Sequence, residues 1–228
     1  MGREADRAGR TVPALAACVT VLSVWDIVVR PVLPSELHPA GGLLVAGCTV
    51  ALSVWAGLDA DGLGLSPRRL GDGLRYGGLA FGAVTAVLLL GLAIPVTRDS
   101  FHSGRADITA GHLLLQALLT IPLGTVVVEE LAFRGALLGL FRQAMPTTRA
   151  VVACSVLFGL WHVPSVLAAV SGSDGRVLAA ATGTFVATFV AGVAFCWLRL
   201  RSGSLLASAM AHLATNSVAL VVAWLVVH

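Results

Sequence analysis

Three charged side chains interrupt an otherwise apolar stretch at residues 126–142, VVVEELAFRGALLGLFR. They are two adjacent glutamates, Glu129 and Glu130, and Arg134. A charge in hydrocarbon is costly, so three together predict a functional site. Residues four apart share one helical face, whereas neighbours point about 100° apart. The spacing therefore predicts a Glu130–Arg134 pair along one face and a partner on another element for Glu129.

Two further polar interruptions lie in later apolar stretches. One is His162, which ends the sequence FGLWH that begins at Phe158. The other is the pair His212 and Asn216 in HLATN, four apart and hence on one helical face. Each segment also has a plainer interpretation, because intramembrane histidines often link helices by hydrogen bonds and buried charges can form a structural ion-pair network.

The depths of the three interruptions agree. Glu129, His162 and His212 lie eleven to thirteen residues from arginines that flank their apolar stretches, at positions 142, 149 and 201. At a rise of about 1.5 Å per residue, all three lie roughly 15–20 Å from one membrane face. Structural accidents need not agree in depth, so the combination favours one shared site that opens to the cytoplasm.

A carboxylate, two imidazoles and an amide are a competent set for hydrolysis. The carboxylate can take a proton from water as general base. An amide and an imidazole can donate to a developing oxyanion. Two imidazoles and a carboxylate also match a catalytic zinc shell, which here would be Glu129, His162 and His212. No serine stands in a nucleophile-elbow pattern, which disfavours a serine mechanism.

The composition is that of a membrane protein. Of 228 residues, 57% are hydrophobic and only 12% are charged, against about 25% charged in a soluble domain. The net charge of +3 comes mostly from loops, which predicts an orientation in the bilayer and no nucleic-acid partner. Four scattered cysteines, with no CxxC pair, predict neither a disulfide framework nor a cysteine zinc site.

Seven apolar stretches are long enough to cross the hydrocarbon, which takes about 20 residues. We therefore predict an all-α polytopic transmembrane bundle that forms one integral membrane domain over residues 1–228. Residues 11–96 hold three accessory spans, and residues 109–227 hold the core with the polar motifs. The predicted spans are residues 11–29, 41–58, 74–96, 109–130 with a helical extension to about 142, 149–170, 177–198 and 204–227.

Arginine counts predict the orientation of these spans. With the N-terminus inside, ten arginines lie on the cytoplasmic side and four, Arg30, Arg98, Arg105 and Arg176, lie outside. We therefore expect a multi-pass protein of the cell membrane with a cytoplasmic N-terminus and an external C-terminus. The first stretch is interpreted as an uncleaved span because no small-residue cleavage site follows it. Its Asp26 is near the outer end, within reach of the interface.

Glycine pairs spaced four apart would permit close approach between helices. Examples are Gly73/Gly77, Gly78/Gly82 and Gly135/Gly139.

The three motifs together resemble those of the CAAX-processing and bacteriocin-processing (CPBP, or Abi) family of intramembrane endopeptidases. That family has EExxxR, FxxxH and HxxxN on successive core helices. Here they stand as Glu129-Glu130-Leu-Ala-Phe-Arg134, Phe158-Gly-Leu-Trp-His162 and His212-Leu-Ala-Thr-Asn216. The resemblance covers about residues 120–220, and no motif position departs from the pattern.

The resemblance implies a peptidase whose site lies in the membrane and opens toward the cytoplasm. Its substrate would be a membrane-associated or lipidated, CAAX-like peptide or protein in the bilayer. Glu129 and His162 would activate water, and His212 with Asn216 would stabilise the oxyanion. Glu130, Arg134 and Phe158 would support the site. We favour this metal-free mechanism; a divalent metal such as zinc is the alternative.

Two other classes of function stay open at this point. The chain could be a non-catalytic membrane protein of the same family, such as an immunity factor that binds a toxin or receptor. It could also be a small transporter, although transporters more often contain repeated halves or matched broken helices. All motif residues are present, which favours the peptidase.

Overall fold

The computed structural model describes residues 2–170 and 172–228, and these residues form helices joined by turns, with no β-strand among them. Seven helical segments of this part of the chain are long and apolar enough to cross a membrane. The prediction of an all-α polytopic bundle with about seven spans is thereby confirmed. The segments are Gly9–Val29, Ser35–Trp55, Pro67–Ala93, Ala110–Ala144, Thr147–Ala169, Asp174–Ser202 and Leu205–Val227.

Five spans are built on one long α-helix each, and two are composites. The single helices are α1 (Gly2–Val24), α2 (His38–Trp55), α4 (Leu70–Ala93), α9 (Thr147–Ala169) and α10 (Asp174–Ser202). The fourth span joins α6 (Ala110–Leu115), α7 (Val127–Glu129) and α8 (Leu138–Ala144) through π-helical turns. The last span joins α11 (Leu205–Leu213) and α12 (Ala219–Val227) in the same way. Two short helices, α3 (Ala60–Leu63) and α5 (Pro95–Arg98), lie in connections.

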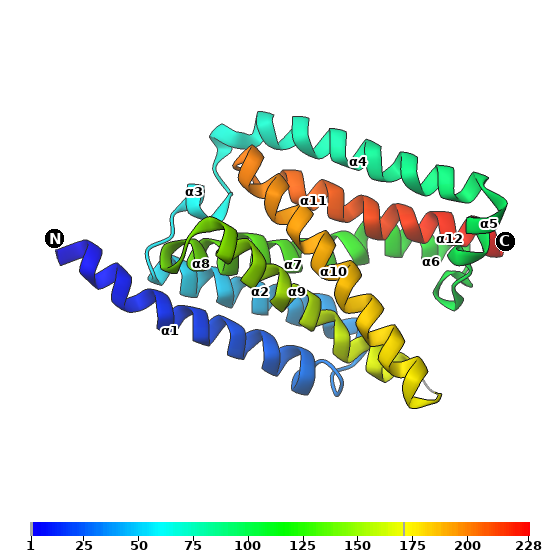
Figure 1. Cartoon of the computed structure of the whole chain (residues 1–228), viewed down its shortest axis with the longest axis horizontal. Helices are drawn as coiled ribbons and strands as arrows, with labels where there is room; N and C mark the ends of the chain where they lie inside the picture. Colours follow the sequence, from blue (N-terminus) through cyan, green and yellow to red (C-terminus); the bar gives the residue numbers. More distant parts are fainter. Residues whose placement is uncertain (1, 171) are drawn as a thin grey trace.

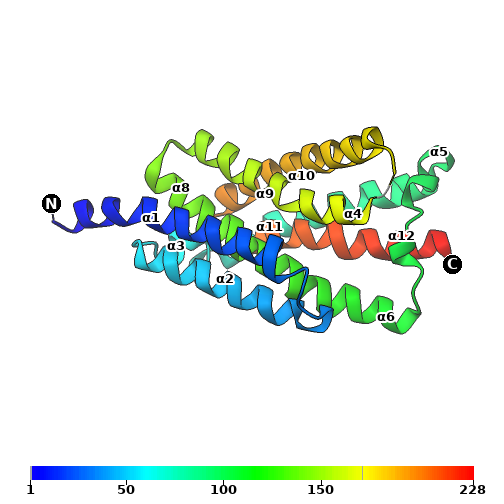
Figure 2. The same cartoon turned by 90° about the horizontal axis from the view of Figure 1, so that it is seen from below.

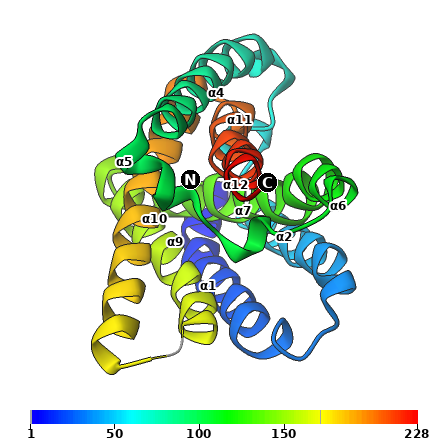
Figure 3. The same ribbon diagram turned by 90° about the vertical axis from the view of Figure 1, so that its right-hand side faces the viewer.

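The fourth span passes through the middle of the bundle. Helix α9 packs against α10, α4 packs against α11, and α1 packs against α2. The end view in Figure 3 shows α7 and α12 near the centre, with α6 at the periphery. The segment with Glu129, Glu130 and Arg134 is therefore enclosed by other helices, where its charges can find partners.

The two chain ends lie at opposite ends of the bundle, as an odd number of spans requires (Figures 1 and 2). The end that carries the N-terminus also holds the turn between α8 and α9. The other end carries the C-terminus, the loop after α1 and the connection from α4 to α6. We refer to these as the N-terminal and C-terminal ends of the bundle.

Among the described residues, three of the five π-helical segments carry Asp26 or motif residues: Trp25–Val29, Glu130–Leu137 and Ala214–Val218. A π-helical turn bonds residue i to i+5, which widens the turn, and such turns are frequent at functional sites. The spacing rules of an ideal α-helix therefore describe these segments only approximately.

Glycines on one face of α4 permit close packing against α11. A Cβ added to Gly73 would lie 2.6 Å from Ser204 Oγ, and one added to Gly77 would lie 2.7 Å from Met210 Sδ. No such neighbour lies within 4 Å of a Cβ on Gly78 or Gly82. Of these two predicted glycine pairs, the first is thus a helix contact and the second faces away from the described part of the protein.

Candidate active site

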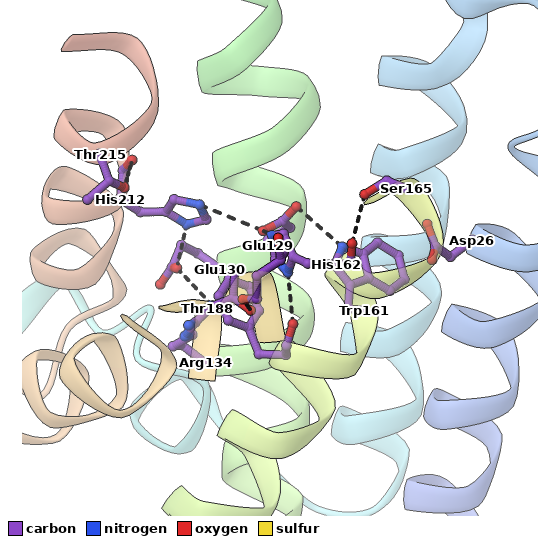
Figure 4. A network of polar contacts seen from close by, with 12 residues as sticks. Asp26, Glu129, Glu130, Arg134, Trp161, His162, Ser165, Thr188, His212 and Thr215 are labelled. Atoms are coloured by element: carbon purple, nitrogen blue, oxygen red, sulfur yellow. Dashed lines mark hydrogen bonds and ion pairs between the residues drawn. The ribbon is translucent and has the colours of Figure 1, made fainter. Parts of the chain in front are cut away.

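Glu129 and Glu130 follow one another where α7 passes into the π-helical segment Glu130–Leu137. Both side chains are buried, with residue exposures of 7% and 2%. They point to different neighbours, as Figure 4 shows: Glu130 faces Arg134 and His212, whereas Glu129 lies between His212 and His162. The site therefore has two parts, one around each glutamate.

Glu130 is the partner of two buried side chains. Arg134 NH1 lies 3.2 Å from Glu130 Oε1, which is the ion pair that the sequence spacing predicts. The same oxygen accepts a hydrogen bond from His212 Nδ1 on α11 at 3.0 Å. Because carboxylate oxygens can only accept, this bond assigns the Nδ1 proton of the His212 ring. The contact joins the fourth and last spans.

Aromatic rings enclose the Arg134 guanidinium. Its central carbon lies 3.9 Å from the ring centroid of Phe158 and 4.9 Å from that of Phe195. Among the described residues, none of its three nitrogens has a hydrogen-bond partner. The buried cation is therefore stabilised by the Glu130 charge and by the faces of the rings.

Glu129 has one direct hydrogen bond, from a residue that the sequence analysis did not select. Trp161 Nε1 donates to Glu129 Oε1 at 3.3 Å. The second oxygen, Oε2, is buried and has no hydrogen-bond partner among the described residues. Two imidazole nitrogens face it from opposite helices: His212 Nε2 at 3.7 Å and His162 Nε2 at 3.8 Å. Both separations exceed a hydrogen bond, so neither nitrogen bonds directly to Oε2.

The His162 ring is oriented by its own helix. His162 Nδ1 lies 2.8 Å from the carbonyl oxygen of Phe158, one turn earlier on α9. A carbonyl can only accept, so Nδ1 carries the proton. In the neutral ring, Nε2 is then an acceptor, directed toward Glu129 Oε2. The Phe158 ring packs edge-on against His162, with centroids 4.6 Å apart.

A polar cavity of about 590 Å³ reaches this arrangement. Glu129, His162 and Asn216 all line it, as does Trp161. His212 is not among the lining residues, because it lies buried behind Glu129 with its ring stacked on Phe195 at 4.9 Å. A second cavity of about 250 Å³ shares Glu129 and Trp161 with the first.

The cavity reaches the C-terminal end of the bundle. Its outer residues include Arg30, which follows α1, and Ser100, Phe101 and Ser103 in the connection from α4 to α6. The sequence analysis assigned this end to the outside and expected the cavity to open to the cytoplasm. That combination is wrong, because a cavity at this end opens away from the side that holds the N-terminus. Counting residues to a flanking arginine measures depth, but not the side from which neighbouring helices leave access.

Asp26 also differs from its interpretation in the sequence analysis. It does not reach the interface: its side chain is only 5% exposed, and its Oδ1 is 3.1 Å from Arg30 NH1. Figure 4 shows it beside Trp161. Two sequence signals could have selected the residues that the sequence analysis missed. Trp161 stands directly before the motif histidine His162, and Asp26 and Arg30 have the i, i+4 spacing of a helical ion pair.

A metal cluster is not evident in the geometry. Among residues 2–170 and 172–228, no group of three or more histidine, cysteine or acidic side chains is arranged to hold a metal ion. The donor types of Glu129, His162 and His212 nevertheless match those of a catalytic zinc shell.

Comparison with known proteins identifies the part of the chain that holds the site. A family model described as "Type II CAAX prenyl endopeptidase Rce1-like" matches residues 111–218. These residues make up slightly less than half of the chain and include all three motifs. No curated protein and no solved structure matches the chain. The motifs, their arrangement around Glu129 and this match agree: residues 111–218 are similar to the Rce1-like type II CAAX prenyl endopeptidases, a family of proteases.

Proposed function

We propose that the protein is an intramembrane endopeptidase that uses a water activated by Glu129 and His162. One observation carries the proposal: the buried oxygen Oε2 of Glu129 lacks a direct hydrogen bond and faces the Nε2 atoms of His162 and His212 at 3.8 and 3.7 Å. A water between these groups can donate one hydrogen to Glu129 and one to His162 Nε2. Its lone pair is then free to attack a carbonyl carbon of a peptide in the cavity.

The proton transfers balance through Glu129. As the water oxygen bonds to the carbonyl carbon, its proton passes to the Glu129 carboxylate. When the C–N bond breaks, that proton passes to the departing amine nitrogen. Trp161 supports this role, since its bond to Oε1 holds the carboxylate with Oε2 toward the water.

The tetrahedral intermediate carries a negative oxygen that needs donors. The Asn216 amide lines the cavity with Glu129 and can supply one N–H. His212 can supply a second from Nε2 only when its ring is doubly protonated, because Nδ1–H is directed to Glu130.

The substrate is inferred to be a membrane-associated or lipidated, CAAX-like peptide or protein. Two features support this inference. Glu129 and both histidines lie in spans that can cross the bilayer. The family match also covers these residues. Glu130, Arg134 and Phe158 are inferred to support the site without touching substrate.

The decisive experiment is cleavage of a membrane-tethered peptide library by purified protein in lipid nanodiscs. Wild type should release defined fragments, whereas Glu129→Gln should release none above background while binding the same peptides. Glu129→Gln keeps the size of the side chain but cannot accept the proton. Cleavage at a wild-type rate by this variant would contradict the hydrolytic assignment and would favour a binding or immunity protein.

A metal-bound water remains the alternative for the activation step. Glu129, His162 and His212 would be the ligands, and a bound zinc would lower the pKa of the water. The same cleavage assay decides between the two versions. Activity that survives a chelator supports the metal-free version, and activity lost with a chelator and restored by zinc contradicts it.

The arginine distribution supports an N-terminus inside and a C-terminus outside. Arg199 does not count as a loop charge, because it is buried and donates to the Asp61 and Gly62 carbonyl oxygens. Nine arginines against four remain, so the proposed orientation is unchanged. It implies that the cavity opens toward the external side of the cell membrane. Reporter fusions at both termini test it, and a cytoplasmic signal from the C-terminal fusion would contradict it.

A further inference from the structure

The first span ends in a charged pair at the edge of the candidate site. The π-helical turn Trp25–Val29 continues α1 and is followed directly by Arg30. Asp26 points inward, with 5% of its side chain exposed, whereas 41% of the Arg30 side chain is exposed. Arg30 NH1 lies 3.1 Å from Asp26 Oδ1 and donates a hydrogen bond to it. A buried carboxylate thus holds an exposed guanidinium in one position.

Arg30 also faces the space that leads to Glu129. It lines both the cavity of about 590 Å³ and the neighbouring one of about 250 Å³, and Glu129 lines both as well. Among the described residues that line these two cavities, Arg30 is the only arginine. Asp26 is close enough to interact electrostatically with His162 and Glu129. The pair therefore belongs to the same polar region as the motif residues, although it lies outside residues 111–218.

The bonding of Arg30 leaves donors for another anion. A guanidinium has five N–H donors in a planar fork, and Asp26 occupies one side of it through NH1. An arginine that only anchored a span would extend freely into the headgroups. Here the inward-facing Asp26 holds the Arg30 guanidinium at the cavity. A second carboxylate could form a charge-assisted, bidentate bond to the guanidinium there.

We propose that Arg30, positioned by Asp26, binds a carboxylate of the peptide substrate at the mouth of the cavity. The carboxylate is either the C-terminal group of the peptide or an aspartate or glutamate side chain. This inference rests on the proposed peptidase function and adds a preference for acidic substrates. Arg30 acts as a binding residue and Asp26 as a positioning residue.

Binding is tested first, in a protein that cannot turn the peptide over. Wild-type and Arg30→Gln sites are compared in the Glu129→Gln background, in nanodiscs, with matched membrane-tethered fluorescent peptides. One peptide pair differs only by a C-terminal carboxylate or carboxamide, and another differs only by a glutamate or glutamine. The control is Arg176→Gln, an exposed arginine at the beginning of α10 and at the same end of the bundle.

We expect the acidic member of one pair to bind on the order of tenfold more tightly, and Arg30→Gln to abolish that preference. The pair that shows the preference identifies the source of the carboxylate. Arg176→Gln should keep the preference, and Arg30→Lys should restore part of it. The proposal would be overturned if the Glu129→Gln protein with Arg30 intact bound both members of both peptide pairs with equal affinity. An Arg30→Gln defect of the same size for every peptide would also overturn it, as would a defect that follows the fraction of anionic lipid.

Cleavage by the enzyme with Glu129 intact is the second readout. Arg30→Gln and Asp26→Asn should raise KM for the preferred acidic peptide with little change in kcat, because neither residue touches the scissile bond. Equal losses of kcat for acidic and neutral peptides would mark Arg30 as merely structural. If Arg30-dependent binding is observed but wild type cleaves nothing, the peptidase proposal fails while the carboxylate site stands. If cleavage is observed without the preference, only the carboxylate site fails.

Discussion

Glu129 and Glu130 are adjacent in the chain, and both are buried, yet their surroundings differ. Glu130 shares one oxygen with Arg134 and His212 at 3.2 and 3.0 Å, and the region around it is closed by aromatic rings. Glu129 borders a cavity, accepts one hydrogen bond from Trp161, and keeps its second oxygen unbonded. A carboxylate whose bonds are taken up by neighbours can hold helices together. One that keeps an unbonded oxygen beside a cavity can exchange a proton.

The largest expected effect distinguishes the two glutamates directly. Glu129→Gln should lower turnover by about 10²–10⁴, the usual contribution of a general base, and should leave thermal stability near that of wild type. Glu130→Gln should instead lower thermal stability, because Arg134 loses its buried counter-charge. Single-turnover cleavage and melting are measured on the same samples. If the two variants show the same pattern of defects, the division between the glutamates is wrong.

Arg134→Ala tests the closed region alone. Removing the cation leaves Glu130 as a buried and largely uncompensated charge, at a cost of roughly 3–5 kcal/mol in stability. We expect loss of folded protein or a large fall in melting temperature. Arg142→Ala is the matched control on the same span, because this arginine is exposed and its removal should change stability by about 0.5 kcal/mol or less. An Arg134→Ala protein as stable as the control would contradict the bracing role.

Asn216→Ala tests the cavity side at a second position. Loss of an oxyanion donor should lower turnover by about 10²–10³ while peptide binding persists. Ser217→Ala is its control on the same π-helical turn, since Ser217 Oγ donates to the Ala117 carbonyl oxygen at 2.9 Å and lies away from the cavity. That control should lose about 1 kcal/mol of stability and keep its turnover. A reversed pattern would remove Asn216 from the proposed mechanism.

Trp161→Phe should have the smallest effect. It keeps a ring beside Glu129 but removes the N–H that orients the carboxylate, so we expect kcat to fall about tenfold with little change in KM. Trp224→Phe removes a comparable indole bond, from Nε1 to the Ile108 carbonyl oxygen at 2.8 Å. It should affect stability alone. Unchanged kcat in Trp161→Phe would mean that the orientation of Glu129 does not depend on this bond.

Much of the fold could be predicted from the sequence, because it depends on local properties of the chain. A stretch of about 20 apolar residues has few alternatives to a spanning helix, since backbone groups must be bonded within the bilayer. All seven spans were therefore found, with ends that differ from the structure by at most seven residues. The Glu130–Arg134 contact could be predicted for the same reason, because two residues on one helical turn meet whatever surrounds them.

Contacts between spans could not be predicted in this way. The π-helical turns at residues 130–137 and 214–218 change the directions in which the motif side chains point, compared with an α-helix. No feature of the composition marks these turns. The bond from Trp161 to Glu129 joins residues 32 apart, and the one from His212 to Glu130 joins residues 82 apart. Both depend on the rotation and tilt of packed helices. The end of the bundle at which the cavity opens also depends on this packing, and the expected combination of a cytoplasmic N-terminus with a cytoplasmic opening was wrong.

The sequence by itself determined the membrane-spanning class, the positions of the helices and the set of polar residues that could form a site. Each of these follows from the cost of burying charge and unbonded backbone in hydrocarbon, which any membrane helix meets alone. Only the tertiary structure decided that His212 bonds to Glu130 and that Glu129 borders the cavity. It also decided that Asp26 and Arg30 of an accessory span reach the site. The reason is physical: these relations depend on how the helices pack against one another.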